Sequence, residues 1–202
     1  MAYSTPPTEK GVRQSEEILE AALRCLGRDG FSTTSLSRVA DEAGVSKRMV
    51  LYYFESREAL FDRLAESIGD RLYDALADAT AGLTEPGEVV ESGFNRIWSA
   101  ITSDRGLLIA LFGVTIEGVT DPNLSRTIIK FKDRFRALLK RQMADARAQG
   151  RKTFLDDEVA ATLILSGFLG LAMEWLERGD SPTLKATISS YQAGIAALAP
   201  PA

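Results

Sequence analysis

A short cationic segment in the first third of the chain carries side chains that suit contact with DNA. Lys47, Arg48 and Met49 follow Ser46 directly, and Tyr52 comes four residues after Arg48. On a helix these side chains share one outward face, because residues three or four apart are neighbours. Cations bind phosphate or guanine, and a phenolic hydroxyl binds phosphate. The segment therefore fits a helix in the major groove of DNA.

The surrounding residues predict two short helices joined by a tight turn that would hold this face. Thr34 or Ser35 can cap the first helix and Ser46 the second, because a hydroxyl accepts a hydrogen bond from an orphan backbone N–H. Gly44 tolerates the left-handed backbone of the turn. A small shared core is predicted from four apolar residues: Val39, Ala43, Val45 and Val50. The alternative is an ordinary helical hairpin whose charges face solvent.

Composition limits what kind of nucleic-acid interface is possible. The 202 residues suit one or two domains, and 45% hydrophobic residues suffice for a buried core. The net charge is −4, but residues 1–57 hold equal numbers of basic and acidic side chains. A basic face can therefore exist locally, whereas a broad polycation cannot. We expect a small docked footprint on DNA.

The rarest residue types argue against catalysis, metals and cofactors. The chain has no histidine, which excludes a histidine-based triad and a typical zinc site. Cys25, the single cysteine, lies at helical spacing with Ile18 and Ala22 and is predicted to be a small core residue. One cysteine permits no disulfide within the chain, which suits the reducing cytoplasm. No nucleophile–base pair or metal-ligand cluster is visible, so we expect no enzyme, no cofactor and no metal site.

The rest of the sequence predicts an all-α protein. Apolar residues recur at helical spacing over seven further segments, and no strand-like alternation appears: residues 13–29, 56–82, 86–103, 105–118, 121–150, 156–178 and 181–198. Residues 1–12 contain Pro6 and Pro7 and no apolar signal core, and they are predicted to be a disordered arm without an export signal. The apolar run of residues 159–173 is interpreted as a buried helix, too short to span a bilayer.

Residues 13–64 resemble the tetracycline-repressor (TetR) family of bacterial regulators. The similarity is carried by residues in a fixed order and spacing: Gly30-Phe31, Thr34-Ser35, Val39-Ala40, the run from Ala43 to Lys47, Tyr52-Tyr53-Phe54, Ser56-Arg57-Glu58 and Leu60. The resemblance implies that nine residues contact DNA: Thr34, Ser35, Ser46, Lys47, Arg48, Met49, Tyr52, Tyr53 and Arg57. Arg48 stands where the family usually has glycine, and Leu51 where it often has tyrosine. These departures affect the expected operator sequence and leave the mode of binding unchanged.

The resemblance also implies a division of labour along the chain. Residues 13–58 would form a three-helix, helix-turn-helix DNA-binding domain, and residues 59–202 a helical domain for ligand binding and dimerisation. An apolar pocket is expected from side chains on separate helices: Trp98, Phe112, Thr115, Phe131, Phe135 and Phe168. The last two helices would form a homodimer interface through eight residues: Leu163, Gly167, Leu171, Trp175, Leu184, Ile188, Tyr191 and Ile195.

Two classes of function follow from these expectations. The first is a cytoplasmic, dimeric transcriptional regulator, expected to repress from a palindromic double-stranded operator until a small apolar or amphipathic molecule releases it. A variant of this class is an activator without a small-molecule effector. The second class is a helical ligand-binding or assembly module that does not bind DNA. No membrane partner is expected in either case.

Overall fold

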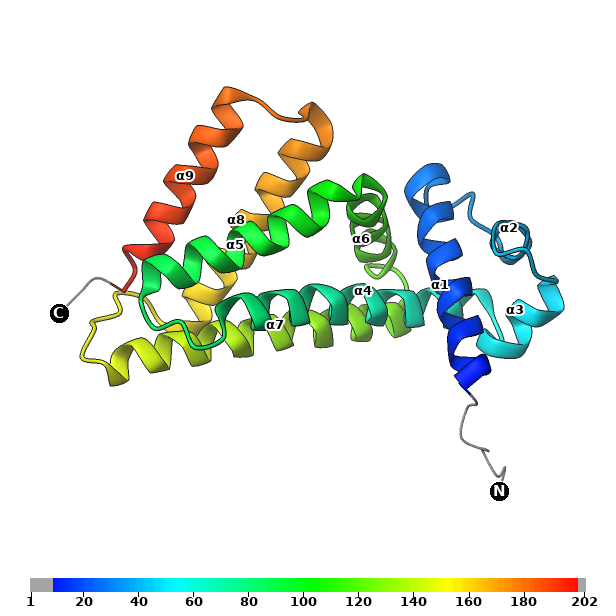
Figure 1. Cartoon of the computed structure of the whole chain (residues 1–202), viewed down its shortest axis with the longest axis horizontal. Coiled ribbons are helices and arrows are strands. Elements are labelled where there is room, and N and C mark those ends of the chain that lie inside the picture. The colour runs from blue at the N-terminus through cyan, green and yellow to red at the C-terminus, as the bar shows by residue number, and fades with distance from the viewer. Residues whose placement is uncertain (1–8, 200–202) are drawn as a thin grey trace, which may run out of the picture. The chain divides into compact units, whose positions relative to one another are not determined.

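The computed structural model describes residues 9–199, and all regular structure in that range is helical (Figure 1). The all-α prediction is therefore confirmed. The helices are α1 (Glu9–Asp29), α2 (Leu36–Glu42), α3 (Lys47–Phe54), α4 (Arg57–Thr80), α5 (Pro86–Ser103), α6 (Arg105–Glu117), α7 (Pro122–Ala148), α8 (Asp157–Arg178) and α9 (Pro182–Ala196).

The first helix starts earlier than the sequence suggested. α1 begins at Glu9, so the predicted disordered arm is wrong for residues 9–12, and residues 1–8 of that arm lie outside the described part of the chain. No helix breaker of the proline type stands between Glu9 and Arg13, and an acidic residue in the first turn complements the helix dipole. The helix is therefore continuous from Glu9, where the described part of the chain begins.

The described residues divide into two compact units. The first unit contains residues 9–68 and Ile109–Ile128, and the second contains Gly69–Leu108 and residues 129–199. The helices α4, α6 and α7 each contribute residues to both units. The boundaries of these units differ from the predicted domain boundary after residue 58. The DNA-binding role of residues 13–58 and the ligand-binding and dimerisation role of residues 59–202 remain predictions.

The first unit is built on apolar side chains that α1 to α4 bury together. Ile18, Val39, Val50 and Leu60 are fully buried, and Cys25 is a buried core residue as predicted. Burial of each such aliphatic side chain contributes about 1.5–3 kcal/mol. Two residues of the predicted helix-pair core, Ala43 and Val45, are only half-buried.

Close helix contacts organise the second unit. A Cβ added to Gly69 on α4 would lie 2.6 Å from the ring of Phe131 on α7, so only glycine admits this approach. Gly167 on α8 is equally close to the ring of Tyr191 on α9, and these two helices lie side by side in Figure 1. In both places glycine has no side chain, and this leaves the space in which an aromatic ring packs.

The helix α8 corrects one expectation about the long apolar run. The whole helix has 22 residues and is long and apolar enough to cross a membrane by length and composition, whereas the run of residues 159–173 within it is shorter. The run does not form a buried helix, since only 22% of the most apolar window of α8 is buried and Val159 and Leu163 are 56% and 49% exposed. Hydropathy does not distinguish side chains that pack within one chain from those that need a second surface.

Candidate nucleic-acid interface

The cationic segment lies on the second helix of a capped helix pair. The Ser35 hydroxyl accepts a hydrogen bond from the Arg38 amide at 3.3 Å and begins α2. The Ser46 hydroxyl accepts one from the Met49 amide at 3.2 Å and begins α3. Gly44 makes the turn between them with φ +66°, a left-handed value that favours glycine. These features confirm the predicted helix-turn-helix.

The outward face of α3 carries the side chains predicted to contact DNA. Lys47 and Arg48 are exposed, Met49 is 41% exposed and Tyr52 is 77% exposed. Within residues 9–199 neither Lys47 nor Arg48 has an ion-pair partner, so both charges are free to meet phosphate or a base edge. The face can therefore supply hydrogen-bond donors to a nucleic acid without first breaking contacts in the protein.

Three other basic side chains close to this helix pair are ion-paired with two carboxylates. Arg24 and Arg28 contact the Glu42 carboxylate at 2.8 and 2.9 Å, joining α1 to the end of α2. Asp29 contacts Arg28 at 3.1 Å and Arg38 at 3.3 Å. Hydrogen bonds from these guanidinium groups lower the pKa of both carboxyls. Among the described residues of the helix pair, the basic side chains without an ion-pair partner, Lys47 and Arg48, are therefore on α3.

One predicted DNA contact, Thr34, needs correction, and a second predicted contact, Arg57, also bonds within the protein. Thr34 is 1% exposed, and its hydroxyl donates to the Gly30 carbonyl at 2.7 Å. The Arg57 guanidinium donates to the carbonyls of Thr34 and Phe31 at 3.0 and 2.7 Å. It also lies over the rings of Phe31 and Phe61, at 4.7 and 4.6 Å from their centroids. Arg57 therefore holds the α1–α2 turn, and its predicted contact with DNA remains a prediction.

The remaining predicted contacts stay open. Ser35 and Ser46 are exposed although their hydroxyls cap helices, and Tyr53 is half-buried between Tyr52 and Phe54. Leu51 is 38% exposed beside the cationic face and was noted in the sequence only as a departure from the TetR pattern. Its position in α3, one residue before Tyr52, is the sequence feature that could have predicted its exposure.

The predicted effector residues form separate groups. Trp98 contacts Phe168 with ring centroids 6.1 Å apart, and both contact Phe94. Phe131 and Phe135 contact each other at 4.9 Å, and Phe135 contacts Tyr73. Phe112 and Thr115 belong to the first unit, and the Thr115 hydroxyl donates to Leu111 in its own helix. The sequence missed Phe94 and Tyr73, although Phe94 lies one helical turn before Trp98.

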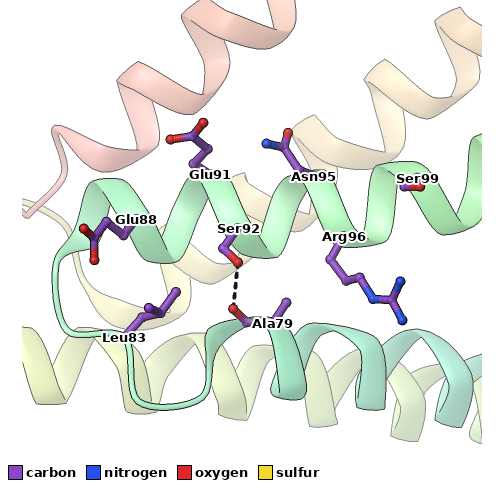
Figure 2. A pocket seen from close by; sticks show the side chains of 8 residues that line it. All are labelled: Ala79, Leu83, Glu88, Glu91, Ser92, Asn95, Arg96 and Ser99. Carbon is purple, nitrogen blue, oxygen red and sulfur yellow. Dashed lines mark hydrogen bonds between the residues drawn. The ribbon is translucent and has the colours of Figure 1, made fainter.

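A groove runs along α5 in the second unit (Figure 2), and none of the predicted effector residues lines it. Its lining is largely polar and includes Glu88, Glu91, Asn95 and Arg96, while the Ser92 hydroxyl donates to the Ala79 carbonyl at 2.7 Å. The full lining is Ala79, Leu83, Glu88, Glu91, Ser92, Asn95, Arg96 and Ser99. An open groove lined mostly by polar and charged residues differs from the aromatic pocket that was expected, so it is not assigned to an apolar effector.

The predicted dimer residues divide between internal packing and exposed surface. Leu184 is 4% exposed and the Tyr191 hydroxyl donates to the Ile164 carbonyl, while Gly167 receives the Tyr191 ring. The burial of Leu184 within the single chain corrects its assignment to an interface, while Gly167 and Tyr191 are half-buried and their assignment remains a prediction. Leu163 is exposed as an interface residue should be, and four others are half-buried: Leu171, Trp175, Ile188 and Ile195. The helical period was right, but it could not tell which side faces outward.

The exposed charged residues of α8 and α9 lie toward the helix ends, and they are Glu158, Glu177, Arg178 and Lys185. The exposed residues of one uncharged surface on α8 are Val159, Thr162, Leu163, Ser166 and Gly170, and those on α9 are Ala186, Ser189, Ser190, Ala193 and Gly194. Hereafter these ten residues are called the α8–α9 face. Small side chains at helical spacing permit close approach of another helix.

The sequence matches known regulators along its first third and more weakly along most of its length. Residues 18–64 match the family of bacterial regulatory proteins described as the tetR family. The nicotine-responsive transcriptional repressor HdnoR of Paenarthrobacter nicotinovorans is 26% identical over 157 residues, covering 76% of this chain and 79% of that protein. The Escherichia coli regulator RutR is 44% identical over 57 residues, covering 28% of this chain and 27% of RutR.

Solved structures show the same fold. A TetR transcription regulator from Haloarcula marismortui superposes with a TM-score of 0.82 at 20% identity, over 94% of this chain and 100% of that one. A TetR-family regulator from a Rhodococcus species gives 0.79 at 18% identity, over 93% and 98%. The similarity therefore extends beyond the helix-turn-helix to the whole helical arrangement of such chains.

Proposed function

The chain belongs to the tetR family of bacterial regulatory proteins, which are DNA-binding transcriptional regulators and not enzymes, and we propose that it is a ligand-responsive repressor. In this proposal a homodimer holds a palindromic operator in the cytoplasm, and a small apolar or amphipathic molecule releases it. The observation that carries the proposal is the unpaired, exposed cationic face of α3, held by two serine caps and a glycine turn.

The chemistry of α3 supports major-groove binding. Lys47 follows the Ser46 cap directly, so its charge lies at the start of the helix where the N-terminal amides also favour phosphate. Arg48 can donate two hydrogen bonds to one guanine, and the exposed Met49 and Leu51 can contact apolar base surface. One helix with these donors gives a small footprint, in keeping with a chain of net charge −4.

A dimer supports recognition of a palindrome. Two copies of α3 must lie about 34–36 Å apart, or a further helical turn, to enter successive major grooves. The α8–α9 face is suited to joining two copies because its ten residues are apolar or small, with the exposed charges of Glu158 and Lys185 at its border. Its apolar exposure is better explained by a second protein chain than by a bilayer, because Thr162, Ser166, Ser189 and Ser190 interrupt it.

A single helix supports coupling of an effector to DNA. α4 places Leu60 and Leu64 in the core of the first unit, and Leu72 and Leu76 in the core of the second. Its first residue, Arg57, also holds the α1–α2 turn. An effector that shifts the second half of α4 would thereby move the residues at its start that hold the helix pair of α2 and α3. The name of HdnoR, which describes a nicotine-responsive repressor, supports a small organic effector as the class.

The test is binding to the DNA that flanks the chain's own gene. Fluorescence anisotropy should show specific affinity of about 10⁻⁸–10⁻¹¹ M for a palindrome there, and at least about 10³-fold weaker affinity for a scrambled site at the same salt concentration. Equal affinity for both sites would overturn the regulator proposal. For an effector found by screening, a coupling of about 1–3 kcal/mol predicts a roughly 5–150-fold change in operator affinity, and operator must weaken effector binding equally. Effector affinity that is unchanged by operator would overturn the release mechanism.

A further inference from the structure

Three basic side chains at four-residue spacing lie on one face of α7 in the second unit. They are Lys132, Arg136 and Lys140. The Lys140 ammonium contacts the Glu158 carboxylate at 2.9 Å, and Arg136 donates from Nη1 to Asp133 at 2.9 Å. Arg136 Nε lies 3.7 Å from Glu158, beyond hydrogen-bond distance. Lys140 also lies near Asp156 and Asp157, so the cation of the three that lacks a carboxylate partner among the described residues is Lys132.

The donors nearest to Lys132 are not satisfied. Arg136 Nε is buried and has no hydrogen-bond partner among residues 9–199. Lys132 is half-buried, and in the same part of the chain no carboxylate or carbonyl pairs with its ammonium. Burial lowers the pKa of Lys132, and the charge of Arg136 lowers it further. A half-buried cation beside another cation, with an orphan donor between helices, is costly unless an anion joins it.

We propose that Lys132 and Arg136 form the head-group subsite of the effector site and bind the carboxylate of an amphipathic monoanion. A carboxylate accepts from the two donors at once, and its single charge pairs with the one cation that lacks a partner, Lys132. A dianionic phosphate would overcompensate that charge. This assignment rests on the proposed function and narrows the effector class to anions.

The test compares three probes of equal chain length and different charge: octanoate, 1-octanol and octylamine. Each is titrated below its aggregation limit into the purified full-length protein without DNA, and binding is followed by calorimetry. We expect octanoate to bind about tenfold or more tightly than 1-octanol, because charge-assisted hydrogen bonds form only with the anion. We expect octylamine to bind more weakly than either, since Lys132 and Arg136 repel it.

Two variants and one control assign the preference to these residues. Lys132→Met and Arg136→Met should each reduce the preference for octanoate over 1-octanol to about threefold or less, whereas Lys130→Met, an exposed lysine on the same helix, should leave it unchanged. Thermal unfolding shows whether a variant that loses the preference for octanoate is still folded. Lys132→Met should keep or raise the melting temperature, because it removes an unpaired half-buried charge.

The outcomes separate this inference from the proposed function. Equal affinities for octanoate and 1-octanol, no detectable octanoate binding, or a preference that survives both substitutions would each overturn the subsite. Octanoate binding that depends on Lys132 supports the subsite even where octanoate fails to release operator DNA. In that case the failure lies in the coupling of α4 to DNA and not in recognition of the anion.

Discussion

Arg57 donates from Nε to the backbone carbonyl of Thr34 over 3.0 Å, and this bond joins two residues that the sequence had placed at the DNA interface. The same guanidinium reaches Phe31 and lies against the ring of Phe61. The first turn of α4 is thereby fastened to the turn that precedes α2. The contact makes Arg57 a positioning residue for the helix pair.

Replacing Arg57 by lysine tests that role. Lysine keeps the charge but cannot donate to two carbonyls from a planar fork, so Arg57→Lys should lower the free energy of unfolding by about 1–3 kcal/mol. Urea denaturation measures this loss. Arg48→Lys is the control and should leave stability within about 0.5 kcal/mol, since Arg48 is exposed and unpaired within the described chain. Unchanged stability of Arg57→Lys together with weaker DNA binding would instead indicate a phosphate contact.

Lys47 and Arg48 should contribute to DNA binding in different ways. Arg48→Ala should cost about 1–3 kcal/mol on the matched operator and relax discrimination at one base pair, if Arg48 binds a base edge. Lys47→Ala should weaken matched and scrambled sites alike and reduce the salt slope by about 1. Anisotropy titrations at several salt concentrations distinguish the two, with Lys130→Ala as an exposed control outside the interface. If neither substitution weakens either site, α3 is not the DNA-reading helix.

The features that the sequence predicted well depend on local physics. The caps at Ser35 and Ser46 and the turn at Gly44 each involve residues within four positions of one another. Their energetics are set by backbone geometry, so residue type and spacing suffice to place them. The exposed face of Lys47 and Arg48 follows directly from those boundaries.

The features that the sequence missed depend on contacts between distant segments. Arg57 bonds to Phe31 across 26 positions, and no local pattern distinguishes that contact from an outward-facing guanidinium. Leu184 and Leu163 are both leucines at helical spacing, yet one is buried in the chain and the other is exposed. The aromatic residues expected in one pocket are divided because helix packing, rather than composition, decides which rings meet.

Acid should loosen the attachment of α1 to α2. Hydrogen bonds from arginine lower the pKa of Asp29 and Glu42 in the folded protein, so their contribution to stability is complete above the unfolded pKa values of about 4. It is lost as pH falls through the lower folded values. Glu42→Gln should therefore reduce the fall in melting temperature between about pH 5 and pH 3. Glu16→Gln, an exposed control on α1, should retain the full fall. Identical profiles for Glu42→Gln and the original chain would contradict this account.

Two glycines of α8 should respond oppositely to alanine. The new methyl of Gly167→Ala would lie 2.5 Å from the Tyr191 ring and force it away, costing about 1–3 kcal/mol. Gly170→Ala meets nothing within 4 Å in the single chain, and its higher helix propensity should stabilise the fold by about 0.5–1 kcal/mol. Chemical denaturation at a concentration that keeps both variants in the same oligomeric state measures the difference. Equal stability of the two variants would show that Tyr191 does not need the space at Gly167.

Leu163 and Leu184 provide a matched pair for locating the dimer interface. Leu163 is 49% exposed on the α8–α9 face, so Leu163→Glu should place an unpaired charge in the interface and give a monomeric mass by light scattering at micromolar concentration. Leu184 is 4% exposed within one chain, so Leu184→Ala should lower the free energy of unfolding by about 2–5 kcal/mol and keep the dimeric mass below its melting temperature. Circular dichroism confirms that Leu163→Glu remains helical. A dimeric mass for folded Leu163→Glu would move the interface away from this face. Because two copies of α3 must bind one palindrome together, the monomeric variant should also lose most of its operator affinity while it still binds its effector.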